Sequence, residues 1–226
     1  LLIVLGCRLS TITSGPDPKK FARDAKIVII DIDPLEHSKN NVFIDYLIIS
    51  DLKNFLSKIN EKTLKKTNDE WINKCLHWKS IFMISEKEFE KKKKIDLYHL
   101  SIVFSNILPK NSTFITDSGL IELILPNNIQ FQSNQRCIHP ASQGSMGYAL
   151  PAIIGSYYAD ETRPIISVIG DGSIMMNLQE LQTIHGYKIP AKIFILNNEG
   201  YHSIRQTQHN YFNGREIGCG KSSGLT

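Results

Sequence analysis

The sequence of 226 residues has only four cysteines, and none of them lies close to another. Cys7, Cys75, Cys137 and Cys219 lack the short spacings of a zinc knuckle or of a disulfide framework. Their distribution favours reduced thiols in a chain that does not depend on cross-links. We therefore expect a cytoplasmic protein.

Long apolar runs are also lacking. The opening run Leu1–Leu5 is interrupted by Gly6 and Arg8, well short of the roughly 20 residues that a membrane span requires, and no secretory signal is visible. The chain begins without methionine, inside what reads as a buried strand, and stops in loop-like sequence over Gly218–Thr226. We expect no membrane segment, and we expect both ends to be cut from a longer chain.

No charge of one sign dominates, because the formal net charge is only +4. The densest basic stretch, Lys91–Lys94, follows three glutamates and contains no interleaved aromatic residue. This pattern is typical of a solvated helix face or linker and not of a nucleic-acid surface. The sequence also shows no internal repeat and no low-complexity tract, so we expect a globular protein without a nucleic-acid partner.

Strand and helix signals alternate along the first part of the chain. Leu1–Leu5, Ala25–Ile32 and Val42–Ile49 are continuous apolar runs, which predict strands of a parallel sheet covered on both faces. Helical spacing follows from Leu52 to Ile59, and again over Trp71, Cys75 and Trp78. The tryptophan pair is more typical of core or docking surface than of a cofactor site.

A second α/β unit is predicted from about residue 95. Its elements are a helix over Leu97–Leu108, strands over Ser112–Thr116, Pro164–Ile169 and Ala191–Leu196, a glycine-rich loop leading into a buried helix over Gly144–Ala159, and a helix over Asn177–Tyr187. The predicted fold class is α/β, with parallel sheets flanked by helices. The predicted divisions are 1–60, a helical linker over 61–94, and 95–226.

Two polar motifs follow neighbouring strands of this second unit. Asp171 lies in Gly170-Asp171-Gly172 after one strand, and Asn198 follows the next. Parallel strands of a βαβ unit end at one edge, about 4.8 Å apart, so a carboxylate and an amide oxygen can reach one Mg²⁺. The glycines allow a bulky anion to approach, and the helix expected after Ser173 offers N–H groups to it.

Each motif alone is more typical of a turn, but the two together at matching strand ends predict a metal and diphosphate site. A backbone carbonyl near Gly200 would complete the protein ligands. The remaining positions on the ion would be left for diphosphate oxygens.

The stretch GDGSIMMNLQELQTIHGYKIPAKIFILNNEGY resembles the thiamine diphosphate signature of the acetolactate synthase/pyruvate decarboxylase family, especially acetolactate synthase large subunits. The resemblance implies that Asp171 and Asn198 bind Mg²⁺ through their side chains and Gly200 through its carbonyl. It also implies that residues around the diphosphate include Gly170, Gly172, Ser173, Tyr201 and His202.

The segment HPASQGSMGYALPAIIGS resembles the part of the family that grips the cofactor's aminopyrimidine. The resemblance implies main-chain bonds from Gly144 and Met146, with Met146 propping the cofactor into a bent shape; from the residue type alone, Met146 is more typical of a core. Asp117-Ser118-Gly119 resembles the entry to this domain. Ser118 is a candidate diphosphate contact, with a simple turn residue as the alternative.

The pieces LLIVLGCRL and AKIVIIDIDPLEHSKN resemble the end of the family's Rossmann-like middle domain, which holds FAD in some members. Asp31 or Asp33 could bond a ribose, although a cap on the following helix is the more common role of an aspartate at a strand end. No Gly-x-Gly-x-x-Gly sequence is present, which argues against dinucleotide binding.

The resemblance implies decarboxylation and carboligation of a 2-keto acid such as pyruvate. The catalytic residue stays unknown, because the activating glutamate of the family lies in an N-terminal domain that nothing here matches, so this chain alone should not turn over. The complete enzyme would be a homodimer or homotetramer. The stretch YHSIRQTQ departs from the acetolactate synthase pattern, which leaves open another thiamine diphosphate lyase or transferase of sugar or polysaccharide synthesis, or a non-catalytic cofactor-binding subunit.

Three histidines remain open in their roles. His202 could contact diphosphate or substrate, and His139 could approach the cofactor but is more typical of a structural loop residue. His209 lies on what reads as a mobile segment over the site.

Overall fold

The computed structural model describes residues 1–39, 42–59, 68–82, 85–86, 94–141 and 143–224. Contacts divide the chain into two compact units, Leu1–Leu76 and His77–Thr226, and each unit is described by itself. Much of the predicted linker over 61–94, including Lys91–Lys93, lies outside the described residues. The predicted boundaries of 1–60, 61–94 and 95–226 therefore stay a prediction.

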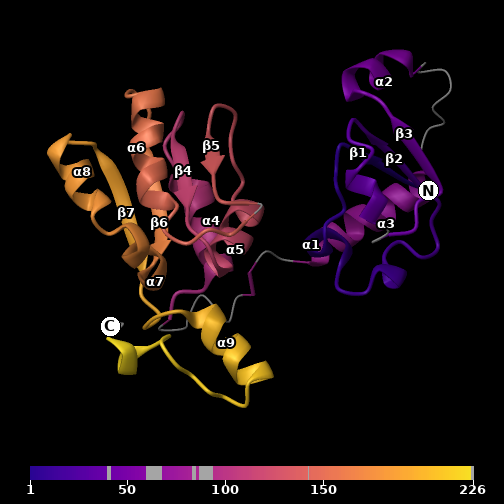
Figure 1. Ribbon diagram of the computed structural model, residues 1–226. Helices are drawn as coiled ribbons and strands as arrows, with labels where there is room; N and C mark the ends of the chain where they lie inside the picture. The colour runs from indigo at the N-terminus through magenta and orange to yellow at the C-terminus, as the bar shows by residue number, and fades with distance from the viewer. Residues whose placement is uncertain (40–41, 60–67, 83–84, 87–93, 142, 225–226) are drawn as a thin grey trace. The chain divides into compact units, whose positions relative to one another are not determined.

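The first unit is built on a parallel sheet of three strands in the order β1-β2-β3. Apolar side chains around the central strand β2 form its core, including Val4, Leu9, Ile29 and Val42. The expectation of strands buried on both faces holds for β2 but is wrong for β1 and β3, because every residue of β3 is exposed and only Val4 of β1 is buried. The elements are β1 (Leu2–Leu5), α1 (Thr11–Ser14), β2 (Ile27–Asp31), β3 (Tyr46–Ile49) and α2 (Leu52–Lys58), with short 3-10 turns η1 (Pro18–Lys20) and η2 (Glu36–Lys39) (Figure 1). The division between the two units falls within helix α3 (Asp69–Ile81).

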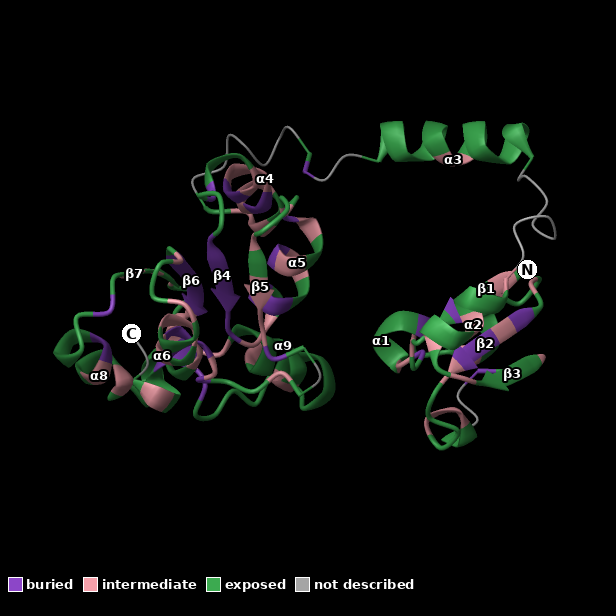
Figure 2. Ribbon diagram, turned by 90° about the horizontal axis from the view of Figure 1, so that it is seen from above, coloured by how far each residue is buried: buried purple, intermediate pink, exposed green. Residues whose placement is uncertain are grey.

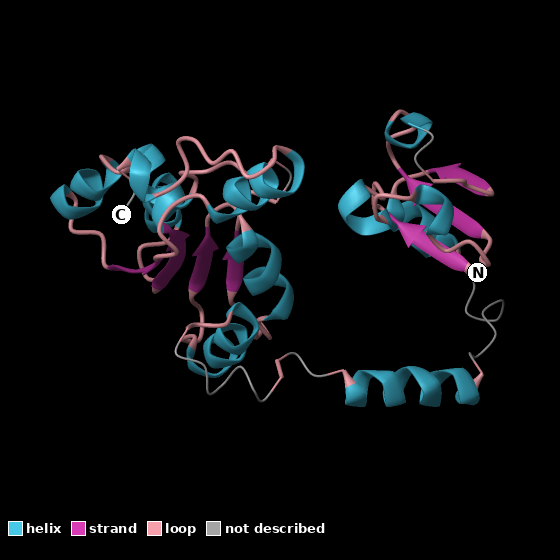
Figure 3. Cartoon of the chain, turned by 90° about the horizontal axis from the view of Figure 1, so that it is seen from below, coloured by secondary structure: helices cyan, strands magenta, loops and turns pink. Residues whose placement is uncertain are grey.

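The second unit contains a parallel sheet of four strands in the order β5-β4-β6-β7. In Figure 3 the arrows of the sheet point the same way, so the carboxyl ends of the strands form one edge. The register pairs Thr116 with Val168 and Gly170 with Leu196, which aligns the ends of β6 and β7. The strands are β4 (Thr113–Thr116), β5 (Arg136–Ile138), β6 (Ile165–Gly170) and β7 (Ala191–Leu196).

Helices cover both faces of β4 and β6, because alternate apolar residues of these strands point to opposite sides. Ile115, Ile165 and Ile169 pack with the buried face of helix α6 (Ala149–Ala159). Phe114, Ile166 and Val168 pack with helices α4 (Leu97–Ile107) and α5 (Leu120–Asn128) on the other side. Figure 2 shows the buried central strands between these layers.

The segment after β6 is helical from its first residue. The helix α7 (Asp171–Ile174) starts at Asp171, where the sequence predicted a start after Ser173, and continues through a 3-10 turn, η5 (Met175–Asn177), towards α8 (Glu180–Gly186). Past β7 come α9 (His202–Tyr211) and the 3-10 turn η6 (Lys221–Ser223). The elements α1, α5, β5 and α9 were not expected from the sequence, and His209 lies within α9, where a mobile segment was expected.

Among the described residues, no helix is both long enough and apolar enough to span a membrane.

Candidate cofactor and metal site

Three strand ends bring the candidate side chains to one edge of the second sheet. Asp117 follows β4 directly, Asp171 follows β6 directly, and Asn198 lies two residues beyond β7. Because β4, β6 and β7 are adjacent and parallel, these positions lie along the same sheet edge. The topology thus satisfies the condition on which the sequence argument depended.

The carboxylate of Asp171 joins the two strand-end loops. Its Oδ1 accepts a hydrogen bond of 2.9 Å from the N–H of Gly172, and its Oδ2 accepts one of 2.8 Å from the N–H of Gly200. The second bond spans the βαβ unit, from the end of β6 to the loop after β7. Asp171 therefore fixes the position of the segment that carries Asn198.

The loop after β7 has a tight backbone conformation. Glu199 has a φ of 66° and Gly200 a φ of 115°, both in the region that L-residues adopt at a cost. A Cβ on Gly200 would lie 2.5 Å from the carbonyl oxygen of Cys219, so only glycine fits at this position. The Gly200 carbonyl accepts a hydrogen bond of 3.1 Å from the N–H of His202 and keeps a second lone pair for a ligand.

The glycine after Asp171 is covered by an aromatic ring. A Cβ on Gly172 would lie 2.5 Å from Cδ1 of Tyr201, so the ring of Tyr201 packs directly on the Gly172 backbone. Gly172 and Ser173 are buried, Tyr201 is half-buried, and His202 is exposed at the start of α9. The close packing leaves the start of α7 without room for a side chain at position 172.

The loop predicted to grip the aminopyrimidine is held by Asp117. This aspartate is fully buried, and its Oδ1 accepts hydrogen bonds from the N–H groups of Ser118, at 2.8 Å, and Gly147, at 3.0 Å. Its Oδ2 accepts one of 2.8 Å from Ala149, at the start of α6. One carboxylate thus connects the end of β4, the glycine-rich loop and the following helix.

Asn177 connects this loop to the segment after β6. Its Nδ2 donates a hydrogen bond of 2.8 Å to the carbonyl of Gly147, and a Cβ on Gly147 would lie 2.6 Å from Cβ of Met176. The two segments that were predicted to bind opposite ends of the cofactor therefore pack against each other. Met146, beside this contact, is 40% exposed and therefore is not a core residue.

A buried acid lies beside the same loop. Glu122, on α5, is about nine-tenths buried, and its Oε1 lies 3.7 Å from Nδ1 of His139. Its Oε2 lies 3.5 Å from the position that a Cβ on Gly144 would take, and Oγ of Ser118 lies 3.7 Å from that position. Burial raises the pKa of the Glu122 carboxyl, an effect that His139 partly offsets and Asp117 reinforces.

The donor set matches the chemistry of a magnesium–diphosphate group. Asp171 presents carboxylate oxygens, Asn198 an exposed amide, and Gly200 a carbonyl; all are hard oxygen ligands of the kind that Mg²⁺ prefers. Among the described residues no group of three histidines, cysteines, aspartates or glutamates could hold a metal. A bound ion would therefore depend on few protein ligands and on phosphate oxygens. The individual roles of the candidate residues stay predictions.

Four residues near this edge were not among the site residues predicted from the sequence. They are Asp117, which holds the glycine-rich loop, and Asn177, Glu122 and Arg205. Their sequence signal is poor. Asp117, Asn177 and Glu122 act through contacts with segments distant in the chain, and Arg205 acts across the junction between the loop after β7 and α9. The Asp117-Ser118-Gly119 turn did mark the right place, but the sequence singled out Ser118.

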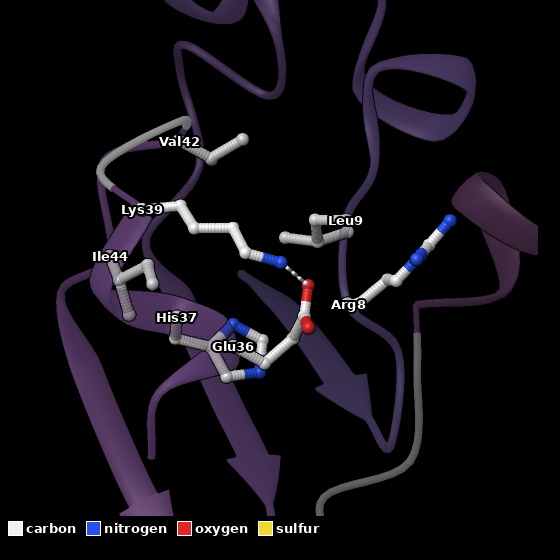
Figure 4. Close-up of a pocket in the computed structure, with 7 residues that line it drawn as sticks. All are labelled: Arg8, Leu9, Glu36, His37, Lys39, Val42 and Ile44. Atoms are coloured by element: carbon white, nitrogen blue, oxygen red, sulfur yellow. Dashed lines mark hydrogen bonds and ion pairs between the residues drawn. The ribbon is translucent and has the colours of Figure 1, made fainter. Parts of the chain in front are cut away.

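The first unit contains a small pocket lined by Arg8, Leu9, Glu36, His37, Lys39, Val42 and Ile44, in which Lys39 pairs with Glu36 (Figure 4). The aspartates proposed for a ribose are already engaged nearby. Oδ2 of Asp31 lies 3.0 Å from Nε2 of His37, a hydrogen bond that lowers the pKa of Asp31. Asp33 Oδ1 accepts from the N–H groups of Leu35 and Glu36, which is the capping role that the sequence favoured.

The fold and the edge geometry together define an α/β domain that gathers oxygen ligands at the ends of parallel strands. Comparison with known families then identifies the class of protein. Residues 1–59 match the thiamine pyrophosphate enzyme central domain, and residues 117–225 match the thiamine pyrophosphate enzyme C-terminal TPP binding domain. The chain belongs to the thiamine pyrophosphate enzymes, which confirms the family and the fold class predicted from the sequence.

Curated relatives include acetolactate synthase large subunits. That of Cyanidium caldarium is 34% identical over 95% of this chain and 37% of its own length. The probable acetolactate synthase large subunits of Methanococcus aeolicus and Methanocaldococcus jannaschii are 32% and 33% identical, over 96% and 98% of this chain and 38% and 39% of their own lengths. The chain thus spans less than two fifths of the length of these relatives.

Proposed function

We propose that this chain is the cofactor-anchoring part of a Mg²⁺- and thiamine diphosphate-dependent enzyme that decarboxylates a 2-keto acid such as pyruvate and ligates the product to an acceptor. The bond between Asp171 Oδ2 and the N–H of Gly200 is the observation that supports this proposal most directly. It brings the carboxylate after one strand against the loop that carries the amide after the next. The family membership supports the choice of cofactor.

The residues of the chain would divide the work of anchoring. Asp171, Asn198 and the carbonyl of Gly200 would hold the metal, while the buried backbone of Gly172 and Ser173 would face the diphosphate with Tyr201 and His202 nearby. When bound, thiamine diphosphate supplies the electron sink that decarboxylation of a 2-keto acid requires. The protein's contribution is binding and orientation.

The second loop would orient the other end of the cofactor. Gly144 and Met146 would present main-chain groups to the aminopyrimidine, and Met146 would keep the cofactor bent. Asp117 and Asn177 support this role, because they hold Gly147 through its N–H and its carbonyl. The loop is thus fixed before a ligand arrives, which lowers the entropic cost of binding.

Further parts of the proposal concern the complete protein. We expect a cytoplasmic homodimer or homotetramer in which a glutamate from a domain outside this chain activates the aminopyrimidine. FAD in the first unit is part of the family resemblance, and the engaged carboxylates of Asp31 and Asp33 speak against a ribose contact there.

The test measures binding of thiamine diphosphate to the full-length protein by titration calorimetry, with and without Mg²⁺. Asp171→Asn keeps the side-chain volume but removes a charged oxygen ligand, and we expect it to weaken Mg²⁺-dependent binding of thiamine diphosphate by more than about 100-fold, beyond the loss typical of an outer-shell partner. Glu161→Gln, an exposed charge change at a distance in sequence from both motifs, is the matched control.

Product analysis with pyruvate, alone and with a second 2-keto acid, then distinguishes decarboxylation from ligation. Unaltered cofactor binding by Asp171→Asn would refute the proposed site. Cofactor binding without any turnover of a 2-keto acid would refute the proposed reaction and favour the non-catalytic subunit.

A further inference from the structure

The guanidinium of Arg205 holds the loop after β7 from outside. Its Nη2 donates a hydrogen bond of 2.8 Å to the carbonyl of Asn198, and its Nη1 donates to the carbonyl of Glu199. The same Nη1 lies 3.3 Å from the carbonyl oxygen of Cys219. One half-buried side chain on α9 therefore binds two consecutive peptide groups of the candidate metal loop and one of a distant segment.

The conformation of the loop needs such support. Glu199 and Gly200 both have positive φ values, and for the glutamate this conformation is strained relative to the right-handed region. Strain of this kind persists only where surrounding contacts determine the backbone. With the carbonyls of Asn198 and Glu199 turned towards Arg205, the N–H of Gly200 faces Asp171 at 2.8 Å.

The chain after α9 returns to the same loop and strengthens the contact. The carbonyl of Cys219 accepts a hydrogen bond of 3.0 Å from the N–H of Tyr201, and Nζ of Lys221 lies 2.6 Å from Oε1 of Glu199. Gln208, one turn after Arg205, accepts through its Oε1 from the N–H of Ile217 and from Sγ of Cys219. Helix α9 thus holds both the metal loop and the segment that covers it.

We infer that Arg205 is a positioning residue for the metal: it keeps the turn from Asn198 to Gly200 in the conformation that binds Mg²⁺ and diphosphate, without touching either. The inference rests on the proposed function. A planar guanidinium suits the role because it presents several N–H donors in a fixed arrangement to several carbonyls at once, whereas an ammonium presents a compact charge. The stretch YHSIRQTQ, which departs from the acetolactate synthase pattern, carries both Arg205 and Gln208.

The experiment measures Mg²⁺-dependent binding of thiamine diphosphate to the full-length protein, together with thermal unfolding in the absence of both. Arg205→Met should weaken the apparent Mg²⁺ affinity by about 10- to 100-fold, the loss typical of residues that orient metal ligands. Arg205→Lys should recover only part of it. Arg215→Met removes the same charge from an exposed position after α9 and should bind like the unaltered protein.

The stability measurement separates positioning from general support of the fold. We expect the unfolding temperature of ligand-free Arg205→Met to stay close to that of Arg215→Met, while the rise in unfolding temperature on adding Mg²⁺ and cofactor shrinks. An equal loss of stability with and without ligand, in Arg205→Met and Arg205→Lys alike, would overturn the inference. So would an unchanged Mg²⁺ dependence.

Asp171→Asn, measured in parallel, separates a failure of the inference about Arg205 from a failure of the proposed function. If it abolishes binding while Arg205→Met binds normally, the inference about Arg205 is wrong and the proposed function stands. If Asp171→Asn binds normally, the proposed site is wrong and the inference about Arg205 is wrong with it.

Discussion

The carboxylate of Asp117 accepts a buried hydrogen bond of 3.0 Å from the N–H of Gly147, thirty residues further along the chain. Together with the bonds from Ser118 and Ala149, this contact makes one side chain responsible for three backbone donors. Buried donors that lose their partner cost about 1–3 kcal/mol each. The stability of the second unit and the shape of the glycine-rich loop before α6, called the cofactor loop below, therefore both depend on the carboxylate of Asp117.

We predict that Asp117→Ala lowers the free energy of unfolding of the second unit by about 3 kcal/mol, because at least two buried N–H groups lose their acceptor. Urea unfolding followed by circular dichroism measures the change. Glu161→Gln, on the exposed turn before β6, should change it by no more than about 0.5 kcal/mol. A loss for Asp117→Ala as small as that of the control would mean that water replaces the carboxylate without cost.

Gly147→Ala should destabilise the protein and loosen the cofactor loop. The added Cβ would lie 2.6 Å from Cβ of Met176, and the φ of 79° adds about 1–2 kcal/mol of backbone strain. We expect a total loss of about 2 kcal/mol or more in urea unfolding, accompanied by weaker cofactor binding.

Gly155→Ala is the matched control for this substitution. Gly155 lies exposed within α6, has no positive φ, and a Cβ there meets nothing within 4 Å. Alanine should stabilise the helix by about 0.5–1 kcal/mol. Equal effects of the two substitutions would contradict the close packing of Gly147 on Met176.

Glu122 should make stability depend on pH in a defined direction. Burial raises the pKa of the Glu122 carboxyl above its pKa in the unfolded chain. The contribution of this carboxyl to folding stability is therefore fully present at a pH below the unfolded pKa, and it is lost as the pH rises through the folded pKa. Glu122→Gln does not titrate. Its stability relative to the unaltered protein should therefore increase as the pH rises above 4.5 in parallel urea titrations.

The titratable groups that act on the pKa of Glu122 are His139 and Asp117. The exposed variant Glu161→Gln again serves as the control, and its stability relative to the unaltered protein should not change over the same pH range. A stability difference for Glu122→Gln that shrinks as the pH rises would show that pairing with His139 outweighs burial.

Cys137 should resist alkylation in the folded protein. It lies in β5, and burial raises the pKa of its thiol to about 11. At pH 8 only about one thousandth of a thiol with this pKa is the reactive thiolate. Mass spectrometry after iodoacetamide treatment should show Cys137 unmodified in buffer and modified in urea. Fast modification in buffer would contradict the partial burial of the Cys137 thiol.

The sequence by itself determined the strands other than β5, the parallel order within the βαβ unit, and the two strand-end motifs. The apolar run Ile165–Gly170 is buried along almost its whole length, whereas the equally apolar strands β1 and β3 are largely exposed. A right-handed crossover places Asp171 and Asn198 at one edge of the sheet. These features depend on local periodicity and on general rules of chain connection. The resemblance of the same motifs to a known family then identified the cofactor.

Only the tertiary structure decided which residues hold those motifs in place. Asp117, Asn177 and Arg205 act on backbone groups that lie 30 residues away in the first two cases and at a helix–loop junction in the third. The short strand β5 and the helix α5, which contains Pro126, have weak local signals and form because Phe114 and Ile166 need cover. Hydrogen bonds and packing between distant segments leave no periodic trace in the sequence, because each partner alone looks like an ordinary turn or surface residue.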